Sequence, residues 1–333
     1  MILKKKQAPF VKRDESVATM MRDMIVALLF LMILPVVYNG FRVVTMVLVT
    51  VIACGVGEMI FSLIYTREIN ITELSSVVTG MIIAMLMPVN APMWLPVVAA
   101  LFAVLVAKAP FGSVGNSPFN PAAAGVAFVT ICWPDKIFAY YDSTQQAVLP
   151  LFSDCSVNVI SSSAAVLKNG IKPNVLPMQM LWEQMPGPIG STAALVIVAC
   201  GLYIFLKRTA NWRSAVCFLA AAAIYAALFP RILCSPLTSV KYELLSGSLL
   251  FCSVFMITEP STSPRNGIGR CVYGALGGIL LMLFRTYGAY EQGVCFTVLI
   301  MNALSPCIDH VICYLKAKEV GRHEKDKEAE RTV

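Results

Sequence analysis

Long runs of apolar residues, separated by short polar stretches, dominate the chain. A helix that crosses the hydrocarbon core of a bilayer needs about 20 apolar residues, with a range of about 17 to 25. On this measure the pattern predicts about ten transmembrane helices, at residues 24–38, 43–65, 77–87, 93–107, 119–133, 189–206, 214–229, 244–257, 271–284 and 294–314. The third and eighth segments are short, and each ends at a polar stretch that contains proline.

The composition indicates the same class of protein. Hydrophobic residues make up 58% of the 333 residues and charged residues 14%, whereas soluble domains contain about 25% charged residues. A water-soluble enzyme is therefore excluded. The 20 Gly and 19 Pro residues are spread through apolar stretches, which excludes a collagen-like or disordered chain. We expect an all-α polytopic membrane protein.

The basic residues predict how the helices are oriented. If the N-terminus lies in the cytoplasm, most of the 26 Lys and Arg residues fall in cytoplasmic segments. The exceptions are Arg42, Lys136, Lys168, Lys172, Arg231, Lys241 and Arg285. Because cytoplasmic loops carry an excess of Lys and Arg, we expect both termini in the cytoplasm, which requires an even number of helices.

This topology divides the chain into five parts. They are a cytoplasmic N-terminal segment (1–23), a first membrane half of five helices (24–133), an extracytoplasmic loop (134–188), a second membrane half of five helices (189–315) and a charged cytoplasmic tail (316–333). Connections longer than about 15 residues are usually functional or disordered. The long outer loop is therefore a candidate extramembrane site.

The two membrane halves resemble each other weakly. A short apolar segment opens at Glu73 and closes at Pro88, and another opens at Glu243 and closes at Pro260. By the predicted topology they start from opposite sides of the membrane. Many transport folds repeat five helices with inverted topology, and their short or interrupted helices meet near the midplane. We expect such a 5+5 inverted repeat with two short or broken helices, with a chance similarity as the alternative.

Two polar loops, residues 108–122 and 258–270, interrupt the apolar pattern and are rich in Gly, Pro, Asn and Ser. Irregular backbone at membrane depth is tolerated only where it is buried in protein or lines a cavity. Side chains of these loops could hold the polar rim of a ring cofactor or a cation, and the candidates are Asn116, Asn120, Thr258, Ser261 and Thr262. The alternative is a pair of ordinary interfacial turns.

Three acidic residues, Glu58, Glu259 and Asp309, lie within or at the edge of apolar segments. Such groups are costly in lipid and usually face the protein interior or a water path. We therefore consider them candidates for an ion pathway. The alternative is a carboxylate that reaches the interface or pairs with arginine, as Glu259 would with Arg265 or Arg270.

Motifs for catalysis or metal binding are absent from the sequence. His310 and His323 are the only histidines, and no Ser/His/Asp set, P-loop or nucleotide-binding Gly motif is recognisable. The 11 cysteines contain no CxxC pair, so neither a zinc site nor a cysteine-ligated iron–sulfur cluster is predicted. We expect no catalytic residue in this chain and no binding of nucleic acid.

Three stretches give the chain a family resemblance: KAPFGSVGNSPFNPAAAG, ELLSGSLLFCSVFMITEPSTSPRNGIGR and FRTYGAYEQGVCFTVLIMNALSPCID. They resemble the D subunit of the Rnf electron-transport complex, a relative of the B subunit of the sodium-translocating NADH:quinone reductase. The resemblance extends from about Val26 to Asp309. It implies a flavin-carrying subunit of a bacterial or archaeal cytoplasmic-membrane complex. That complex couples ferredoxin:NAD electron transfer to Na⁺ or H⁺ movement, with other membrane subunits and soluble flavin/iron–sulfur subunits as partners.

The family also implies FMN bound covalently to a threonine in the outer loop. In the matching stretch the acceptor position is Ala164, the residue before it is Ser163, and an acid upstream is replaced by Asn158. Alanine has no hydroxyl to esterify, so FMN is either attached at Ser163, next to Ser162, or has been lost from this loop. The altered flanking residues favour loss. A noncovalent riboflavin or FMN among the membrane motifs is compatible with either outcome.

Another departure from the family is Ser191, where an acid is usual. Two functions therefore remain open: a redox subunit that helps to couple electron transfer to ion translocation, or a transporter-like or scaffold subunit without covalent FMN. The missing catalytic motifs do not separate them, because in electron transfer the cofactor carries the chemistry and the protein positions it.

Overall fold

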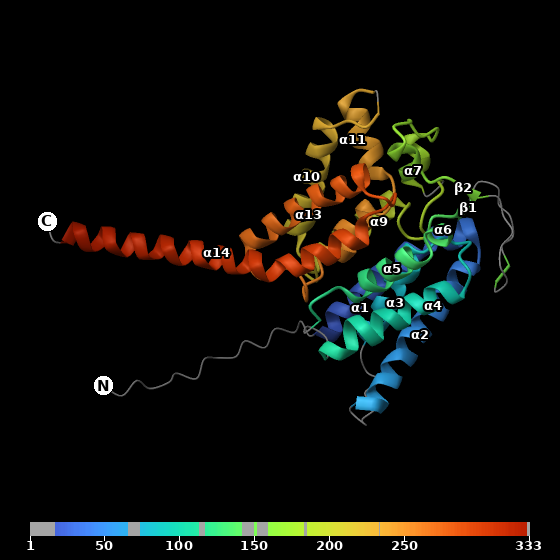
Figure 1. Cartoon of the computed structure of the whole chain (residues 1–333), viewed down its shortest axis with the longest axis horizontal. Helices are drawn as coiled ribbons and strands as arrows, with labels where there is room; N and C mark the ends of the chain where they lie inside the picture. The colour runs from blue at the N-terminus through green and yellow to red at the C-terminus, as the bar shows by residue number, and fades with distance from the viewer. Residues whose placement is uncertain are drawn as a thin grey trace.

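The structure is a computed structural model, and it describes residues 17–65, 74–112, 117–141, 150–151, 159–182, 185–232 and 234–331. Three residues of the sequence predictions, Glu73, Asn116 and Asn158, lie outside the described residues. The described part is predominantly helical, which confirms the predicted fold class (Figure 1).

Each of the ten predicted segments overlaps helical structure. The first half contains α1 (Val17–Asn39), α2 (Arg42–Tyr65), α3 (Leu74–Leu86), α4 (Trp94–Phe102) with the π-helical turn η1 (Ala103–Lys108) and the 3₁₀ turn η2 (Ala109–Phe111), and α5 (Pro121–Cys132). The second half contains α9 (Ala194–Leu206), α10 (Trp212–Leu228), α11 (Pro236–Leu245), α12 (Leu249–Phe251) with the π-helical turn η4 (Cys252–Met256), α13 (Gly267–Tyr287) and α14 (Val294–Arg331). Five of the described helices are long and apolar enough to cross a membrane, and four are shorter apolar helices.

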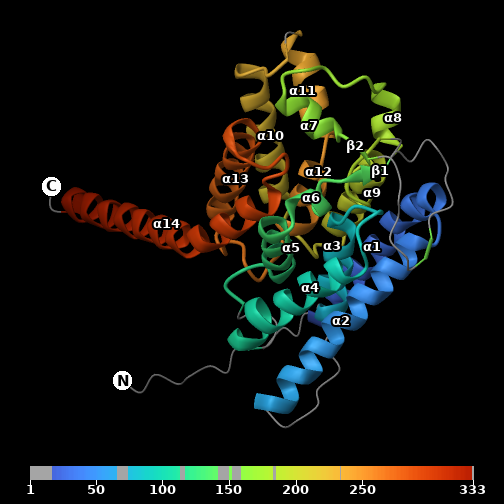
Figure 2. The same cartoon turned by 45° about the vertical axis from the view of Figure 1, so that its right-hand side comes forward.

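Packing partners repeat between the two halves. Helix α2 packs on α4 and α4 on α5, just as α10 packs on α13 and α13 on α14. Helix α1 contacts α3, and α9 contacts α12 and η4. The halves form two neighbouring bodies that meet through α1 with α9 and α5 with α14 (Figure 2). This repetition supports the predicted 5+5 arrangement. An odd number of membrane crossings in the first half would start the second half from the opposite side of the membrane, as an inverted repeat requires.

The predicted segment over residues 244–257 is broken near its start, between α11 and α12, in keeping with the expected short or broken helices. Gly247 adopts a positive φ of 61° at the break, a conformation that glycine reaches without steric cost. The guanidinium of Arg285 donates hydrogen bonds of 2.8 Å to the backbone oxygens of Glu243 and Ser246. A buried cation thus satisfies carbonyls that the end of α11 leaves without helical partners.

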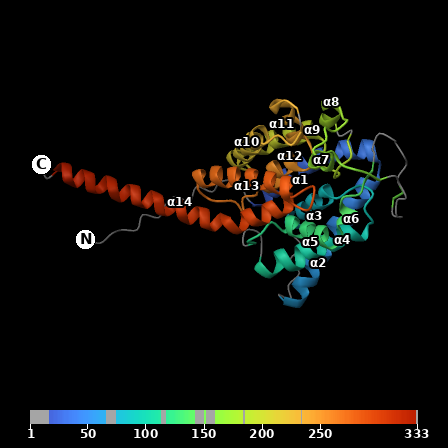
Figure 3. The same ribbon diagram turned by 45° about the horizontal axis from the view of Figure 1, so that its top comes forward.

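The predicted outer loop contains short helices and strands, and the predicted charged tail continues the last helix. The outer segment contains α6 (Pro134–Ile137), β1 (Tyr140–Tyr141), β2 (Val159–Ile160), α7 (Ser163–Lys168) and α8 (Pro177–Leu181). Strands β1 and β2 pair antiparallel, with Tyr140 opposite Ile160. At the other end of the chain, α14 runs on through the charged tail and projects from the body of the molecule (Figure 3).

Glycines on α13 allow it to approach α10 closely. A β-carbon added at Gly274 would clash with the backbone oxygen of Ser214, and one at Gly278 would clash with that of Phe218. The two glycines are four residues apart and therefore share one face of α13. Small residues at this spacing are a common way for membrane helices to pack backbone against backbone.

We predict that Gly278→Ala destabilises the protein by about 1–3 kcal/mol, because the added methyl forces α13 away from α10. Thermal unfolding of the detergent-solubilised protein measures this. Gly55→Ala on α2 is the matched control, since nothing lies within 4 Å of an added β-carbon there. Equal stability of the Gly278→Ala variant and the control would show that this contact does not limit the packing.

Candidate functional site

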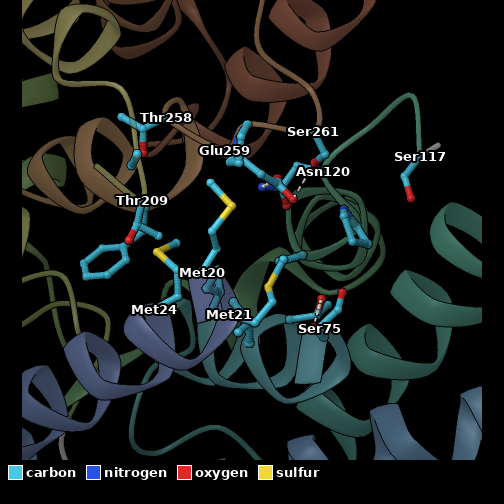
Figure 4. Close-up of a pocket in the computed structure, with 18 of the residues that line it drawn as sticks. Met20, Met21, Met24, Ser75, Ser117, Asn120, Thr209, Thr258, Glu259 and Ser261 are labelled. Atoms are coloured by element: carbon cyan, nitrogen blue, oxygen red, sulfur yellow. Dashed lines mark hydrogen bonds between the residues drawn. The ribbon is translucent and has the colours of Figure 1, made fainter. Parts of the chain in front are cut away.

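The two polar loops singled out in the sequence meet in the structure. The Asn120 side-chain nitrogen donates a hydrogen bond of 2.6 Å to Oε2 of Glu259, and the Ser261 hydroxyl donates one of 3.0 Å to Oε1 (Figure 4). Asn120 also caps α5, because its Oδ1 accepts from the backbone nitrogen of Ala123 at 2.9 Å. The Asn-Pro pair that starts α5 therefore also fixes one end of a contact between the two halves of the chain.

A small cavity of about 50 Å³ lies beside this contact. Three methionines of α1, Met20, Met21 and Met24, line it opposite Glu259 (Figure 4). Its volume suits a few water molecules and is far below the roughly 300–1,000 Å³ of a typical cofactor site. The cavity as it stands accommodates water or a small ion and does not accommodate a flavin ring.

Lys108, at the end of η1, brings a charge into the same cavity. Its side chain is only 4% exposed, and it forms an ion pair with Glu58 of α2. It also donates a hydrogen bond of 3.0 Å to the hydroxyl of Ser76 in α3. One buried ammonium group therefore joins three helical elements of the first half and compensates the charge of Glu58.

The structure corrects the alternative for Glu259, which was a pairing with arginine. Arg270 instead donates to the backbone oxygen of Pro264 at 2.9 Å and to the side chain of Asn211 at 2.7 Å. Among the described residues, the hydrogen-bond partners of the Glu259 carboxylate are the neutral side chains of Asn120 and Ser261.

Three further candidates occupy different places. Thr258 is fully buried and lines the cavity, but its hydroxyl donates to the backbone oxygen of Val254 at 2.5 Å. Thr262 and Asp309 instead line an open groove of about 760 Å³. Asp309 accepts a hydrogen bond of 2.8 Å from the backbone nitrogen of Arg265, so it stabilises the chain that leads into α13.

Sequence reasoning missed Asn302, which lies in α14 and is 2% exposed. Its side chain contacts the hydroxyl of Tyr273 at 2.8 Å. With the amide oriented to satisfy its neighbours, its oxygen accepts from the backbone nitrogen of Asn120 at 2.8 Å and its nitrogen donates to Thr262 at 3.3 Å. Asn302 therefore joins both loops to α14. The signal that could have identified Asn302 is its position as a single amide within an apolar helix, because such side chains form hydrogen bonds to neighbouring helices.

The serines of the outer loop lie in a separate, buried cluster. Ser162 caps α7, where its hydroxyl accepts from the backbone nitrogen of Ala165 at 3.0 Å and donates to Glu291 at 2.8 Å. The hydroxyl of Ser163 contacts the sulfur of Met185 at 3.6 Å. Both serines are at most 3% exposed.

A phosphoester of FMN does not fit these two serines as they stand. Ser162 and Ser163 point into the protein, and Ala164, at the acceptor position, is 3% exposed and has no hydroxyl. Ser191 is also buried, and its hydroxyl donates to the backbone oxygen of Pro188 at 3.2 Å. The site near the outer loop is therefore a structural hydrogen-bond cluster in this conformation.

A model of the NQR2, RnfD, RnfE family matches residues 4–317. The chain belongs to this family. The matched residues include both polar loops, the lining of the cavity and the outer cluster.

The relatives that it resembles belong to ion-translocating complexes. The chain is 28% identical, over 97% of its length and 96% of the relative's, to the D subunit of the Na⁺-translocating ferredoxin:NAD⁺ oxidoreductase complex of Acetobacterium woodii. It is 26% identical, over 91% and 92%, to the D subunit of the proton-translocating ferredoxin:NAD⁺ oxidoreductase complex of Clostridium ljungdahlii. It is 27% identical, over 94% of each chain, to the D subunit of the ion-translocating oxidoreductase complex of Halorhodospira halophila.

We predict that Glu291→Gln makes the stability of the protein less dependent on pH. Burial raises the pKa of the Glu291 carboxyl, against the opposing effect of hydrogen bonds from Ser162 and Tyr140. Because the folded-state pKa is raised, the stability that this group contributes is complete below its unfolded pKa and is lost as the pH rises through its folded pKa. Gln does not ionise and can still accept from Ser162.

The unfolding midpoints of wild-type and variant protein should therefore differ little at about pH 5, and the variant should be the more stable at about pH 8. Asp135 is exposed and lines one open surface pocket together with Glu291. It supplies the control variant Asp135→Asn. A Glu291→Gln protein that is less stable than wild type at both values would contradict the prediction.

Proposed function

We propose that this chain is the D-type membrane subunit of an Rnf-type complex, in which ferredoxin:NAD⁺ electron transfer drives Na⁺ or H⁺ across the cytoplasmic membrane. Its partners would be the other membrane subunits and the soluble flavin/iron–sulfur subunits. Both termini would face the cytoplasm, which places the two polar loops and the cavity toward the cytoplasmic side. The family membership and the matching relatives support this proposal.

The observation that carries the ion-coupling part is the buried charge at the junction of the two halves. Lys108 is 4% exposed and pairs with Glu58, and Glu259 faces the same small cavity. Charged groups inside a membrane protein are costly and mark pathways for ions or protons. Asp309 lies in the open groove and has a structural role at the start of α13.

We further propose that any flavin bound by this subunit is noncovalent. The hydroxyls nearest to the family's attachment position are buried and engaged within the protein. This chain therefore would not present an acceptor to the enzyme that transfers FMN.

Intact mass of the subunit, taken from the purified complex under denaturing conditions, tests the noncovalent proposal. We predict the mass of the unmodified polypeptide and no flavin fluorescence in the denaturing gel. A purified reference protein with covalently bound FMN, run on the same gel, serves as a positive control for fluorescence. A mass increased by one esterified FMN on Ser161, Ser162 or Ser163 would contradict the proposal.

Ion transport by the complex in sealed vesicles tests the main function. With reduced ferredoxin and NAD⁺, we predict ion uptake that is strongly reduced by Glu58→Gln, because this change leaves the buried charge of Lys108 without its carboxylate partner. Asp135→Asn, a carboxylate-to-amide change on the exposed surface, should have no effect. Full transport by an assembled Glu58→Gln complex would count against a role of this pair in coupling.

A further inference from the structure

We propose that Glu259 binds a proton, not a sodium ion, and exchanges it with water in the groove lined by Thr262, Ser263 and Asp309. This inference rests on the proposed function, because it names the ion that the site would handle. The similarities leave the ion open, since one relative is named as Na⁺-translocating and another as proton-translocating.

The first argument is the charge balance of the cavity. The charged side chains described there are Lys108 and Glu259, and Lys108 already pairs with Glu58. The described groups therefore comprise two carboxylates and one ammonium, which leaves one negative charge to be neutralised. Glu259 is half-buried, and a carboxylate that is partly removed from water without a compensating charge favours the uptake of a proton or a cation.

The other walls of the cavity supply no further charge to Glu259. Helix α3 contributes Ser75 and Thr79, and α1 contributes methionines whose nearest acid, Asp23, is held by Thr209 at 3.1 Å. Outside the cavity lining, Tyr273 of α13 is a titratable neighbour of Glu259, and its hydroxyl lies 2.8 Å from the side chain of Asn302. Within the described part of the chain, neutralisation of Glu259 therefore falls to a species from solution.

The second argument is that the polar atoms around Glu259 do not form an oxygen cage. Asn120 presents its amide nitrogen to the carboxylate, while its oxygen caps α5. Ser261 donates its hydroxyl hydrogen to the same group. A hard cation needs about six oxygen ligands, and no group of three or more His, Cys, Asp or Glu side chains that could hold a metal ion occurs among the described residues. The ammonium of Lys108 would also repel a metal cation.

A proton needs none of these ligands, and the small cavity and the open groove share lining residues beside the carboxylate. Ser117 and Ser261 line both the small cavity and the open groove. In the groove, the hydroxyl of Ser263 is buried and has no hydrogen-bond partner within the described structure. Buried polar groups of this kind are commonly satisfied by ordered water. Water in the groove can therefore reach the carboxylate past Ser261.

The step itself is a simple transfer between solvent and carboxylate. A hydronium ion in the groove gives a proton to an oxygen of Glu259, which leaves a water molecule and a neutral carboxylic acid. The reverse transfer restores the carboxylate, and the hydrogen bond from Asn120 then favours the charged form. The cluster with Lys108 and Glu58 is neutral only while Glu259 is protonated.

Infrared difference spectroscopy of the whole purified complex, recorded as the pH is changed, tests this assignment without electron transfer. We expect a carboxylic-acid band that titrates with pH, is the same in NaCl and KCl, and is absent from Glu259→Gln. The Asp135→Asn complex should retain the band, and co-purification of all subunits shows that each variant is assembled.

Two results would overturn the assignment. A band that sodium but not potassium removes would make Glu259 a sodium site, and identical spectra of wild type and Glu259→Gln would show that Glu259 does not titrate. The proposed function fails separately, if vesicles of the wild-type complex move neither H⁺ nor Na⁺ during electron transfer. If Glu259 titrates but the vesicles move neither ion, the proton site is retained and its role in coupling is rejected.

Discussion

A charge inside the membrane part of a protein must be compensated by other protein groups, because lipid offers it neither water nor counterions. In this chain the constraint acts on Lys108, which is 4% exposed and pairs with Glu58 while it also bonds Ser76. The pair fixes η1 against α2 and α3. Glu259 then faces the same cavity from the second half, held by Asn120. The candidate site follows from the way in which these buried charges find partners.

At the opposite end of the bundle, two buried arginines stabilise the backbone where the short helices end. Arg42 donates to the backbone oxygens of Val89 at 2.7 Å and Ala91 at 3.0 Å, just after α3 ends. Arg285 does the same for the end of α11, just before α12 begins. Both guanidinium groups are about 1% exposed. Arg285 therefore satisfies carbonyls that the end of α11 leaves free, and Arg42 satisfies carbonyls of the connection between α3 and α4.

Much of the fold could be predicted from the length of the apolar runs, because the bilayer sets the length of a spanning helix. Broken helices were expected, but the position of the break at Gly247 was not predicted, since it depends on Arg285, which lies far away in the sequence and supplies the missing hydrogen bonds. The site shows the same division. Local composition identified the two polar loops, and in the structure they meet through the hydrogen bond between Asn120 and Glu259. The partner of Glu58, the role of Asn302 and the burial of Ser163 arise from contacts between distant segments.

The measurement that tests the central claim most directly is a double-mutant cycle on Lys108 and Glu58. Lys108→Met, Glu58→Gln and the double variant would be compared by thermal unfolding of the detergent-solubilised protein. If this ion pair organises the junction, each single change removes one member of the pair, and the double variant loses less stability than the sum of the single losses, with a coupling of about 0.5–3 kcal/mol. Losses that simply add would contradict the claim that this ion pair holds the site together.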